Sequence, residues 1–312
     1  MTYPPSGYGN FGPPGPPAGP PAGPPMPPEY GYLVPAMPAY AAPDRLVTPV
    51  HEGFGGWFSR VFATLGRSWL SLVLISWLTY GLPLAVLVPV FRYQLDRMLV
   101  AAPSATGQVS VDDSRVGTLV VIILVAFIVI GFANGVAHAA VVWAVTREAA
   151  GQPRSLGGAL GYGLRNGLRM FGWGLLYGLL VGVGLCACVA PGLYFALAGC
   201  LYVPVALYRR GMHPIGTSFS LVNRNFGAAL GRMALLIVML YGVQLVLAVP
   251  VQAVTLQASQ GVALAVSIVL QFVTAPLTLV TTVGSTLLFA ELWNRQSPIT
   301  IAHLDGALAP AA

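Results

Sequence analysis

Six apolar runs, separated by polar segments, constrain this chain more than any other feature of its sequence. Each run is long enough, or nearly so, to cross ~30 Å of hydrocarbon as a helix, which takes about 20 residues. The fourth run is short for this purpose, and the second and sixth are long enough to tilt or to extend past the bilayer. We predict membrane spans at residues 69–91, 116–145, 171–190, 192–208, 233–256 and 262–293.

Composition supports an all-α integral membrane protein. Hydrophobic residues make up 56% of the chain and charged residues only 8%, against about 25% charged in an average soluble domain. A soluble domain of this size could not keep so many apolar side chains off its surface, so most of them should face lipid. The sequence therefore excludes an ordinary soluble domain.

The first 43 residues differ from everything that follows. They consist mainly of Pro, Gly, Ala and Tyr, with GPPAGPPAGPP at residues 15–25, and such a composition cannot bury a core. We predict a disordered or locally polyproline II tail. It could recruit a protein partner, or it could be a passive solvated segment. The predicted domains are this tail (1–43), a membrane domain (44–295) and a short C-terminal tail (296–312).

Amphipathic segments rich in Gly and Arg precede the first, third and fifth spans. In the first of them, residues 45–68, apolar side chains recur at helical spacing between arginines. This pattern is typical of a helix that lies in the headgroup region. The three segments end at Arg67, Arg169 and Arg232, and an apolar span follows each. We therefore predict three repeats of an interfacial amphipathic helix plus a helical hairpin.

Arginine placement predicts the orientation. The chain has fifteen Arg, no Lys and nine acidic residues, and the arginines gather before the first span and in the second and fourth loops between spans. Under the positive-inside rule both termini are cytoplasmic. The start of the chain lacks the basic and apolar regions of a cleaved signal peptide, so the first span should act as an uncleaved signal in a bacterial plasma membrane.

The basic segments lie against apolar faces, so anionic lipid headgroups are the expected partner rather than nucleic acid. Arg is the better cation for bidentate recognition of phosphate, although the coding bias of a GC-rich genome would also explain an Arg-only sequence. The candidate headgroup ligands are Arg60, Arg67, Arg165, Arg169, Arg224 and Arg232.

Glycines recur at four-residue spacing in two of the spans. Such a row makes a smooth face on which another helix can approach closely. We predict packing surfaces here, either within the chain or between two copies, and the sequence does not fix the oligomeric state. The glycines are Gly131 and Gly135 in the second span and Gly174, Gly178 and Gly182 in the third.

Three polar residues in the spans are candidate functional groups, because polar side chains are costly inside a membrane. Asn134 and His138 share one face of the second span. They could form a proton relay, a substrate contact or a hydrogen-bonded packing pair. Glu291, near the inner end of the sixth span, could pair with one of the arginines that precede the odd-numbered spans, or it could be a functional acid.

The sequence contains none of the common enzyme motifs. It has no GxSxG, HExxH, P-loop or dinucleotide-binding fingerprint, and its acids are scattered apart from Asp112-Asp113. The three cysteines have no nearby His to complete a zinc spacing. We therefore expect a protein that is not an enzyme and that has no cofactor or metal.

The second hairpin and the loop behind it resemble a known membrane domain. The motifs are the Pro191-Gly192-Leu193-Tyr194 break between the third and fourth spans, Pro204, His213-Pro214, and Ser218-Phe219-Ser220-Leu221-Val222 before Phe226. Over about residues 53–291 the chain resembles the six-span domain found beside glycerophosphodiester phosphodiesterase domains, and similar stand-alone bacterial membrane proteins of unassigned function.

The resemblance implies the fold but no catalytic residue. In that family an acid often follows the fourth span, where this chain has Arg209-Arg210. The hydrolase chemistry of the family belongs to a separate soluble barrel, which needs roughly 200 or more residues. No segment of this sequence could form such a barrel.

Two functions of different classes are consistent with these features. The first is a non-enzymatic plasma-membrane scaffold or accessory protein in envelope or lipid metabolism, which binds anionic lipid through its basic interfacial helices. The second is a transporter or lipid translocator that uses a cleft between the helical hairpins, because Pro interrupts several spans.

Overall fold

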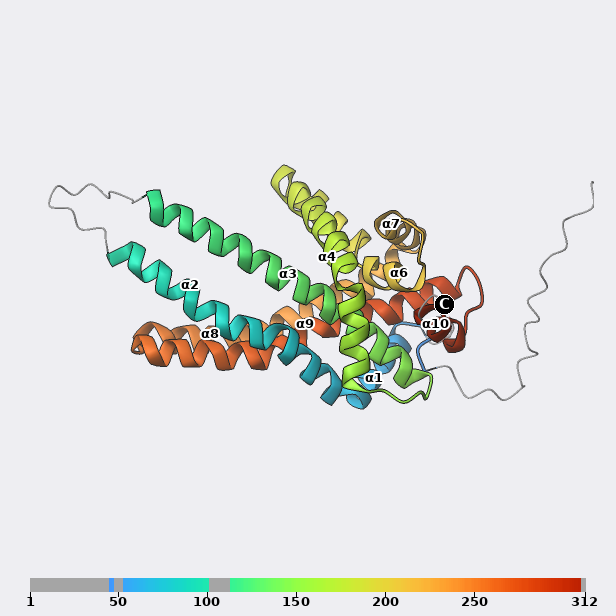
Figure 1. Cartoon of the computed structure of the whole chain (residues 1–312). Coiled ribbons are helices and arrows are strands. Elements are labelled where there is room, and N and C mark those ends of the chain that lie inside the picture. Colours follow the sequence, from blue (N-terminus) through green and yellow to red (C-terminus); the bar gives the residue numbers. More distant parts are fainter. Residues whose placement is uncertain (1–44, 48–52, 101–112, 310–312) are drawn as a thin grey trace, which may run out of the picture. The chain divides into compact units, whose positions relative to one another are not determined.

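The computed structural model describes residues 45–47, 53–100 and 113–309, and these residues form helices and no strands. Within them, six segments are long and apolar enough to cross a membrane, one for each predicted span (Figure 1). The prediction of an all-α multi-pass membrane protein is therefore confirmed. The predicted disordered tail lies outside the described residues, so the prediction that it recruits a protein partner stays a prediction.

The spans are built from the following elements. The first span runs through α1 (Gly53–Ser76), the π-helical turn η2 (Trp77–Gly81) and α2 (Leu82–Val100). The second is α3 (Asp113–Ala149) and the third is α4 (Leu156–Ala187). The fourth is divided into α5 (Val189–Ala198) and α6 (Tyr202–Tyr208), and the fifth and sixth are α8 (Phe226–Gln257) and α9 (Gln260–Asn294). Two short helices, α7 (Pro214–Arg224) and α10 (Ile301–Leu308), lie between and after them.

The first two amphipathic segments are the first halves of spans rather than separate interfacial helices. In α1, side chains at intervals of three or four residues form one buried face that packs against α9 and α3. Because this face continues from the basic segment into the span, nothing divides the two. The third segment alone forms a separate helix, α7, which ends at Arg224, just before α8 begins at Phe226. The proposed threefold repeat stays a prediction. The buried residues of α1 are Trp57, Val61, Thr64, Ser68, Leu72, Ile75 and Ser76.

The first and sixth spans meet where both depart from regular helix. Pro276 lies within α9 and has no N–H, so the carbonyl of Phe272, four residues earlier, loses its helical donor. The indole N–H of Trp77 donates to this carbonyl at 2.8 Å. Gly81 closes the π-helical turn, and a Cβ at this position would lie 2.7 Å from the Phe272 ring. The two irregularities thus form one contact between the helices.

The hairpin between the third and fourth spans breaks at Cys188 and not at the predicted Pro191-Gly192. Cys188 has an extended backbone (φ −172°, ψ 152°) and joins α4 to α5. Pro191 lies in the first turn of α5, where a missing N–H is tolerated because the first N–H groups of a helix have no helical partner. Gly192 makes the hairpin tight, since a Cβ there would lie 2.5 Å from the Leu185 side chain.

The C-terminal segment is packed rather than a free tail. α10 buries Leu304 and Leu308 against α3 and α6, and Asp305 lies 3.3 Å from Arg147 Nε of α3, measured to Oδ1. Figure 1 shows α6, α7 and α10 gathered at the end of the bundle where α3 and α9 finish. The membrane domain therefore extends past the predicted boundary at residue 295.

Candidate functional site

Arginines concentrate at one end of the helix bundle, which we call the basic end. It contains the starts of α1, α4 and α8, the ends of α3, α6 and α9, and the short helices α7 and α10. Carboxylates are few there. Those with described side chains are Glu148, Glu291 and Asp305, and each forms an ion pair with arginine. How these few acids are distributed decides which arginines remain available to a ligand.

Arg232 and Glu291 form a buried ion pair between α8 and α9. Arg232 Nη1 lies 2.7 Å from Glu291 Oε1, and the two side chains are 4% and 1% exposed. Arg295 reaches the same oxygen at 2.7 Å, and Arg232 Nη2 donates to the Gly53 carbonyl at 3.2 Å. Arg232 is thus enclosed by protein, and its prediction as a headgroup ligand is wrong. Glu291 takes the ion-pair role, one of the two that the sequence suggested.

Arg67 is also paired, but nearer the surface. Its Nε donates to Glu148 Oε1 at 2.7 Å, and the side chains are 37% and 10% exposed. Arg45 approaches the same oxygen at 3.8 Å, while Arg154 Nη2 donates to the Arg67 carbonyl at 2.9 Å. Sequence reasoning missed Glu148, although a lone carboxylate beside Arg147 at the end of a long apolar run was a visible signal.

Apart from Arg154, which donates to the Ser68 hydroxyl and to the Arg67 carbonyl, five arginines form no ion pair with any carboxylate in the described part of the chain, and we call them the unpaired arginines. They lie on α4, on the connection from α6 to α7, and at the end of α7. Three are exposed (Arg165, Arg210 and Arg224), and two are half-buried. Arg60, another predicted headgroup ligand, is half-buried and has an interaction partner. The unpaired arginines are Arg165, Arg169, Arg209, Arg210 and Arg224.

Two of the unpaired arginines act electrostatically on one tyrosine. The charges of Arg169 and Arg210 both act on the Tyr162 hydroxyl, whose oxygen is buried. Leu164 and Leu168, on the same helix, are 58% and 72% exposed. Uncompensated positive charge and exposed apolar side chains thus occur on one stretch of α4.

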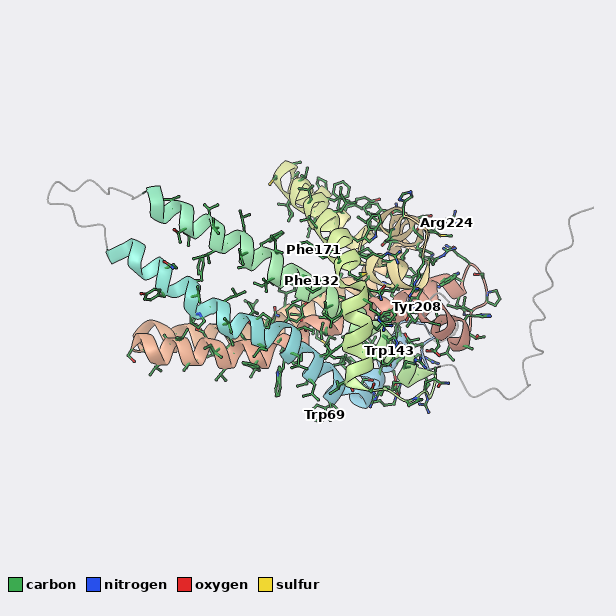
Figure 2. All side chains as sticks on the ribbon, viewed as in Figure 1. Trp69, Phe132, Trp143, Phe171, Tyr208 and Arg224 are labelled. Carbon is green, nitrogen blue, oxygen red and sulfur yellow. The ribbon has the colours of Figure 1, made fainter. Side chains whose placement is uncertain are left out.

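α3 and α4 cross through reciprocal contacts between glycines and aromatic rings. The two rings, of Phe132 and Phe171, are labelled in Figure 2. A Cβ at Gly131 would lie 2.5 Å from the Phe171 ring, and a Cβ at Gly167 would lie 3.1 Å from the Phe132 ring. A Cβ at Gly135 would lie 2.7 Å from the Gly167 carbonyl oxygen. Gly131 and Gly135 therefore pack within the chain, and their partner glycine belongs to the segment that we expected to be an interfacial helix.

The other predicted glycine face does not pack against a helix over most of its length. At Gly178 and Gly182 a Cβ would meet nothing within 4 Å, and at Gly174 it would meet only the Tyr202 hydroxyl at 3.4 Å. Beyond its crossing with α3, α4 pairs with α5 through another face, where a Cβ at Gly184 would lie 2.7 Å from a ring atom of Phe195. The predicted face is left open, and it lines a cavity of about 1300 Å³.

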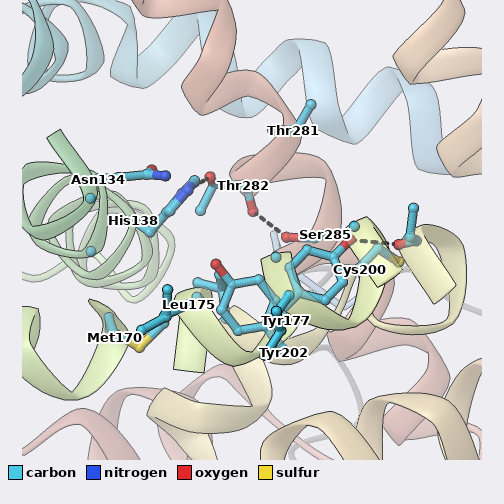
Figure 3. A pocket seen from close by; sticks show the side chains of 18 of the residues that line it. Asn134, His138, Met170, Leu175, Tyr177, Cys200, Tyr202, Thr281, Thr282 and Ser285 are labelled. Carbon is cyan, nitrogen blue, oxygen red and sulfur yellow. Dashed lines mark hydrogen bonds between the residues drawn. The ribbon is translucent and has the colours of Figure 1, made fainter. Parts of the chain in front are cut away.

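The cavity is bounded by α3, α4, α5, α6, α8 and α9 (Figure 3). Asn134 and His138, the polar pair of the second span, both line it. The Tyr80 hydroxyl donates to Asn134 Oδ1, and His138 Nδ1 lies 2.5 Å from Thr282 Oγ1 of α9. Each member of the pair is therefore hydrogen-bonded to a different neighbouring segment, and the role of the pair stays a prediction.

Two tyrosines that sequence reasoning missed complete the polar wall of the cavity. The Tyr177 and Tyr202 rings lie 4.8 Å apart between centroids. The Tyr177 hydroxyl donates to the Ala196 carbonyl at 2.7 Å. The Tyr202 hydroxyl has no hydrogen bond within the described part of the chain and points into the cavity (Figure 3). Nothing in the sequence distinguishes Tyr202 from the other aromatic residues of the spans.

Comparison of the chain with protein-family models, with curated proteins and with solved structures gives no match. Residues 45–47, 53–100 and 113–309 hold no group of three or more His, Cys, Asp or Glu that could bind a metal ion. The resemblance to the membrane domain beside glycerophosphodiester phosphodiesterases stays a prediction. The two regions of the structure that bear on function are the unpaired arginines and the cavity.

Proposed function

We propose that this chain is a non-enzymatic accessory or scaffold protein of a bacterial plasma membrane, which acts in envelope or lipid metabolism and binds anionic lipid at its basic end. The observation that supports the proposal is the set of unpaired arginines, two of which, Arg165 and Arg169, lie beside exposed apolar side chains on a membrane-spanning helix. A phosphate group is a suitable ligand because the guanidinium group donates two parallel hydrogen bonds to it.

The exposed leucines support a lipid rather than a soluble phosphate as the ligand. Leu164 and Leu168 lie within one turn of Arg165 and Arg169, so an anion bound there would have hydrocarbon beside it. Each Arg near an anionic leaflet contributes about 1 kcal/mol to binding. Several unpaired arginines together would therefore select anionic lipid even though each contributes little.

The same charges support a cytoplasmic basic end, since arginine-rich loops stay inside. Both ends of the described chain, α1 and α10, lie at this end, so both termini would be cytoplasmic. Single cysteines at Gly216, in α7, and at Gln260, where α9 begins, test this in a background without Cys186, Cys188 and Cys200. We expect labelling of position 216 from inside only and of position 260 from outside only. The reverse pattern would overturn the orientation.

Lipid selection is tested with two variants that remove the same amount of charge. In R165Q/R169Q/R210Q the substitutions fall on unpaired arginines at the basic end. In R92Q/R97Q/R115Q they fall in α2 and α3, toward the opposite ends of these helices. Each protein is reconstituted in mixed phosphatidylcholine and phosphatidylglycerol, and the lipid that it retains is measured by native mass spectrometry.

We expect the wild type and R92Q/R97Q/R115Q to retain phosphatidylglycerol preferentially, and R165Q/R169Q/R210Q to lose this preference. Thermal stability should not change in any of them, because the substituted side chains at the basic end form no ion pairs with described carboxylates. Equal retention of phosphatidylglycerol by all three proteins would rule out the unpaired arginines as lipid ligands.

A second candidate function, a lipid translocator or transporter, is favoured by the cavity of about 1300 Å³. Translocation needs a path for a polar group across hydrocarbon, and the cavity contains polar groups at mid-span. The test uses vesicles that contain the reconstituted chain and a fluorescent phospholipid, with a quencher added outside. If the chain translocates lipid, the quenched fraction of the fluorescence should exceed the fraction of the phospholipid in the outer leaflet. Quenching that stops at the outer-leaflet fraction, as in protein-free vesicles, would exclude this function.

A further inference from the structure

The cavity has a chemistry that the proposed headgroup contact at the basic end does not explain. Its lining contains no Arg, Asp or Glu, and glycine and other apolar residues form most of it. Its volume of about 1300 Å³ exceeds the roughly 300–1,000 Å³ of pockets that hold drug-sized ligands. We propose that this cavity binds a diacylglycerol-type lipid, with an acyl chain along the glycine face of α4 and the glycerol ester and hydroxyl groups against Tyr202, Asn134 and His138.

Three polar groups on one wall have hydrogen-bonding capacity left for a ligand. Tyr202 is 9% exposed, and its hydroxyl points into the cavity without a partner in the described chain (Figure 3). Asn134 uses its Oδ1 with Tyr80, which leaves the amide N–H groups. His138 uses Nδ1 with Thr282, which leaves Nε2. A ligand that accepts a hydrogen bond from the Tyr202 hydroxyl gains an interaction that the described residues do not supply.

The open glycine face of α4 fits an acyl chain in length as well as in polarity. From Gly174 to Cys186 the cavity-lining stretch of α4 covers about 18 Å at 1.5 Å per residue, and Gly178 and Gly182 leave it smooth. Half of the ~30 Å hydrocarbon core, the share of one leaflet, is about 15 Å. An acyl chain that fills one leaflet therefore matches this stretch of α4 in length.

The absence of charge selects among lipids. A phosphate or a free carboxylate placed at the polar wall would lose its hydration and gain no ionic partner from the lining. Ester carbonyls and a hydroxyl need only hydrogen bonds, and the three free groups of the wall can supply these. The neutral lipid of the cavity and the anionic lipid of the basic end are thus different ligands, and the cavity proposal does not depend on the basic end.

The test uses the full chain in phosphatidylcholine vesicles with a diacylglycerol probe that carries a photoactivatable group in one acyl chain. After illumination, labelled peptides are located by mass spectrometry. We expect the probe to label peptides of α4 and α3 that line the cavity. In G178L/G182L the added side chains fill the open face, and labelling of these peptides should be lost. G172L is the matched control, because Gly172 lies on the same helix, also has nothing within 4 Å, and does not line the cavity.

A milder variant keeps the test informative if G178L/G182L does not fold. Tyr202→Phe removes one hydroxyl and almost no packing volume. The affinity for the probe should therefore fall roughly two- to tenfold, as expected for one hydrogen bond. R165Q/R169Q/R210Q should leave diacylglycerol labelling unchanged, which separates this proposal from the one for anionic lipid.

Three results would overturn the proposal. The first is equal labelling of the cavity peptides in the wild type, G178L/G182L and G172L. The second is equally strong labelling of these peptides by a photoactivatable phosphatidylglycerol, which would show that the site does not select uncharged lipid. The third is a cross-linked dimer joined through these peptides, which would show that a second copy fills the cavity.

Discussion

The arginines that begin the spans have two different environments. At α1 and α8, Arg67 and Arg232 each face a carboxylate at the end of the following span, Glu148 and Glu291 respectively. At α4, Arg169 has no such partner among the described residues, and the next span ends in more arginine. One kind of arginine fixes two helices to each other, and the other kind carries positive charge that no described carboxylate neutralises.

This difference shows that position within a span does not decide what an arginine does. The three segments look alike in sequence, each with glycines, apolar residues and a final Arg. The carboxylate on the following span decides the outcome, because it gives the guanidinium group an ionic partner within the protein. An arginine without one has no ionic partner among the described residues and stays available to an anionic ligand.

The largest effect is expected at the buried pair. Glu291→Gln would leave Arg232 enclosed at 3% exposure with its charge uncompensated, which typically costs about 3–5 kcal/mol. Arg232→Gln should cost less, because Glu291 would keep Arg295 at 2.7 Å. Thermal unfolding of both variants in the same detergent measures the difference. If the two variants lose the same stability, Arg295 does not compensate.

A double replacement provides the control for this pair. In Arg232→Met with Glu291→Leu both charges are removed, and replacement of a buried ion pair by apolar residues is often neutral. We expect the double variant to be more stable than Glu291→Gln. A double variant as unstable as the single one would mean that shape, rather than uncompensated charge, explains the loss.

A smaller effect is expected at α1 and α3. Arg67 is 37% exposed in its pair with Glu148, so water screens the interaction and its loss should cost up to about 1 kcal/mol. Because screening depends on salt, the stability difference between wild type and Arg67→Gln should shrink as ionic strength rises. The difference at Glu291 should change much less. Equal salt dependence at both positions would contradict the assignment of one pair as buried and the other as surface.

The spans could be predicted from sequence because the signal is local. A long apolar run between arginines specifies a membrane helix whatever packs beside it, and all six runs appear as such helices. The boundaries were less predictable. Pro191 in the hairpin looked like the break, but a Pro in the first turn of a helix is compatible with α5.

The glycines and arginines show why the sites were less predictable than the spans. Gly131 and Gly135 touch a neighbouring helix, whereas Gly178 and Gly182, at the same spacing, face a cavity. Spacing describes one helix face and contains no information about what lies opposite. The burial of Arg232 likewise depends on a residue of another helix, which periodicity cannot reveal.

The final prediction concerns a variant in which a carboxylate replaces one of the unpaired arginines. Arg210→Glu would reverse a charge that acts on the same Tyr162 hydroxyl as the charge of Arg169 does. The substitution removes one cation and adds an anion, so retention of anionic lipid should fall further than in Arg210→Gln.

Arg224→Glu is the matched control for Arg210→Glu, because it makes the same change of charge at the end of α7. Stability should change by less than about 1 kcal/mol in each variant, as for other exposed charges. Native mass spectrometry in mixed lipid then compares the two. A larger loss of anionic lipid in Arg210→Glu than in Arg224→Glu would show that Arg169 and Arg210 act together on one ligand. Equal losses would mean that they contribute only to the general charge of the basic end.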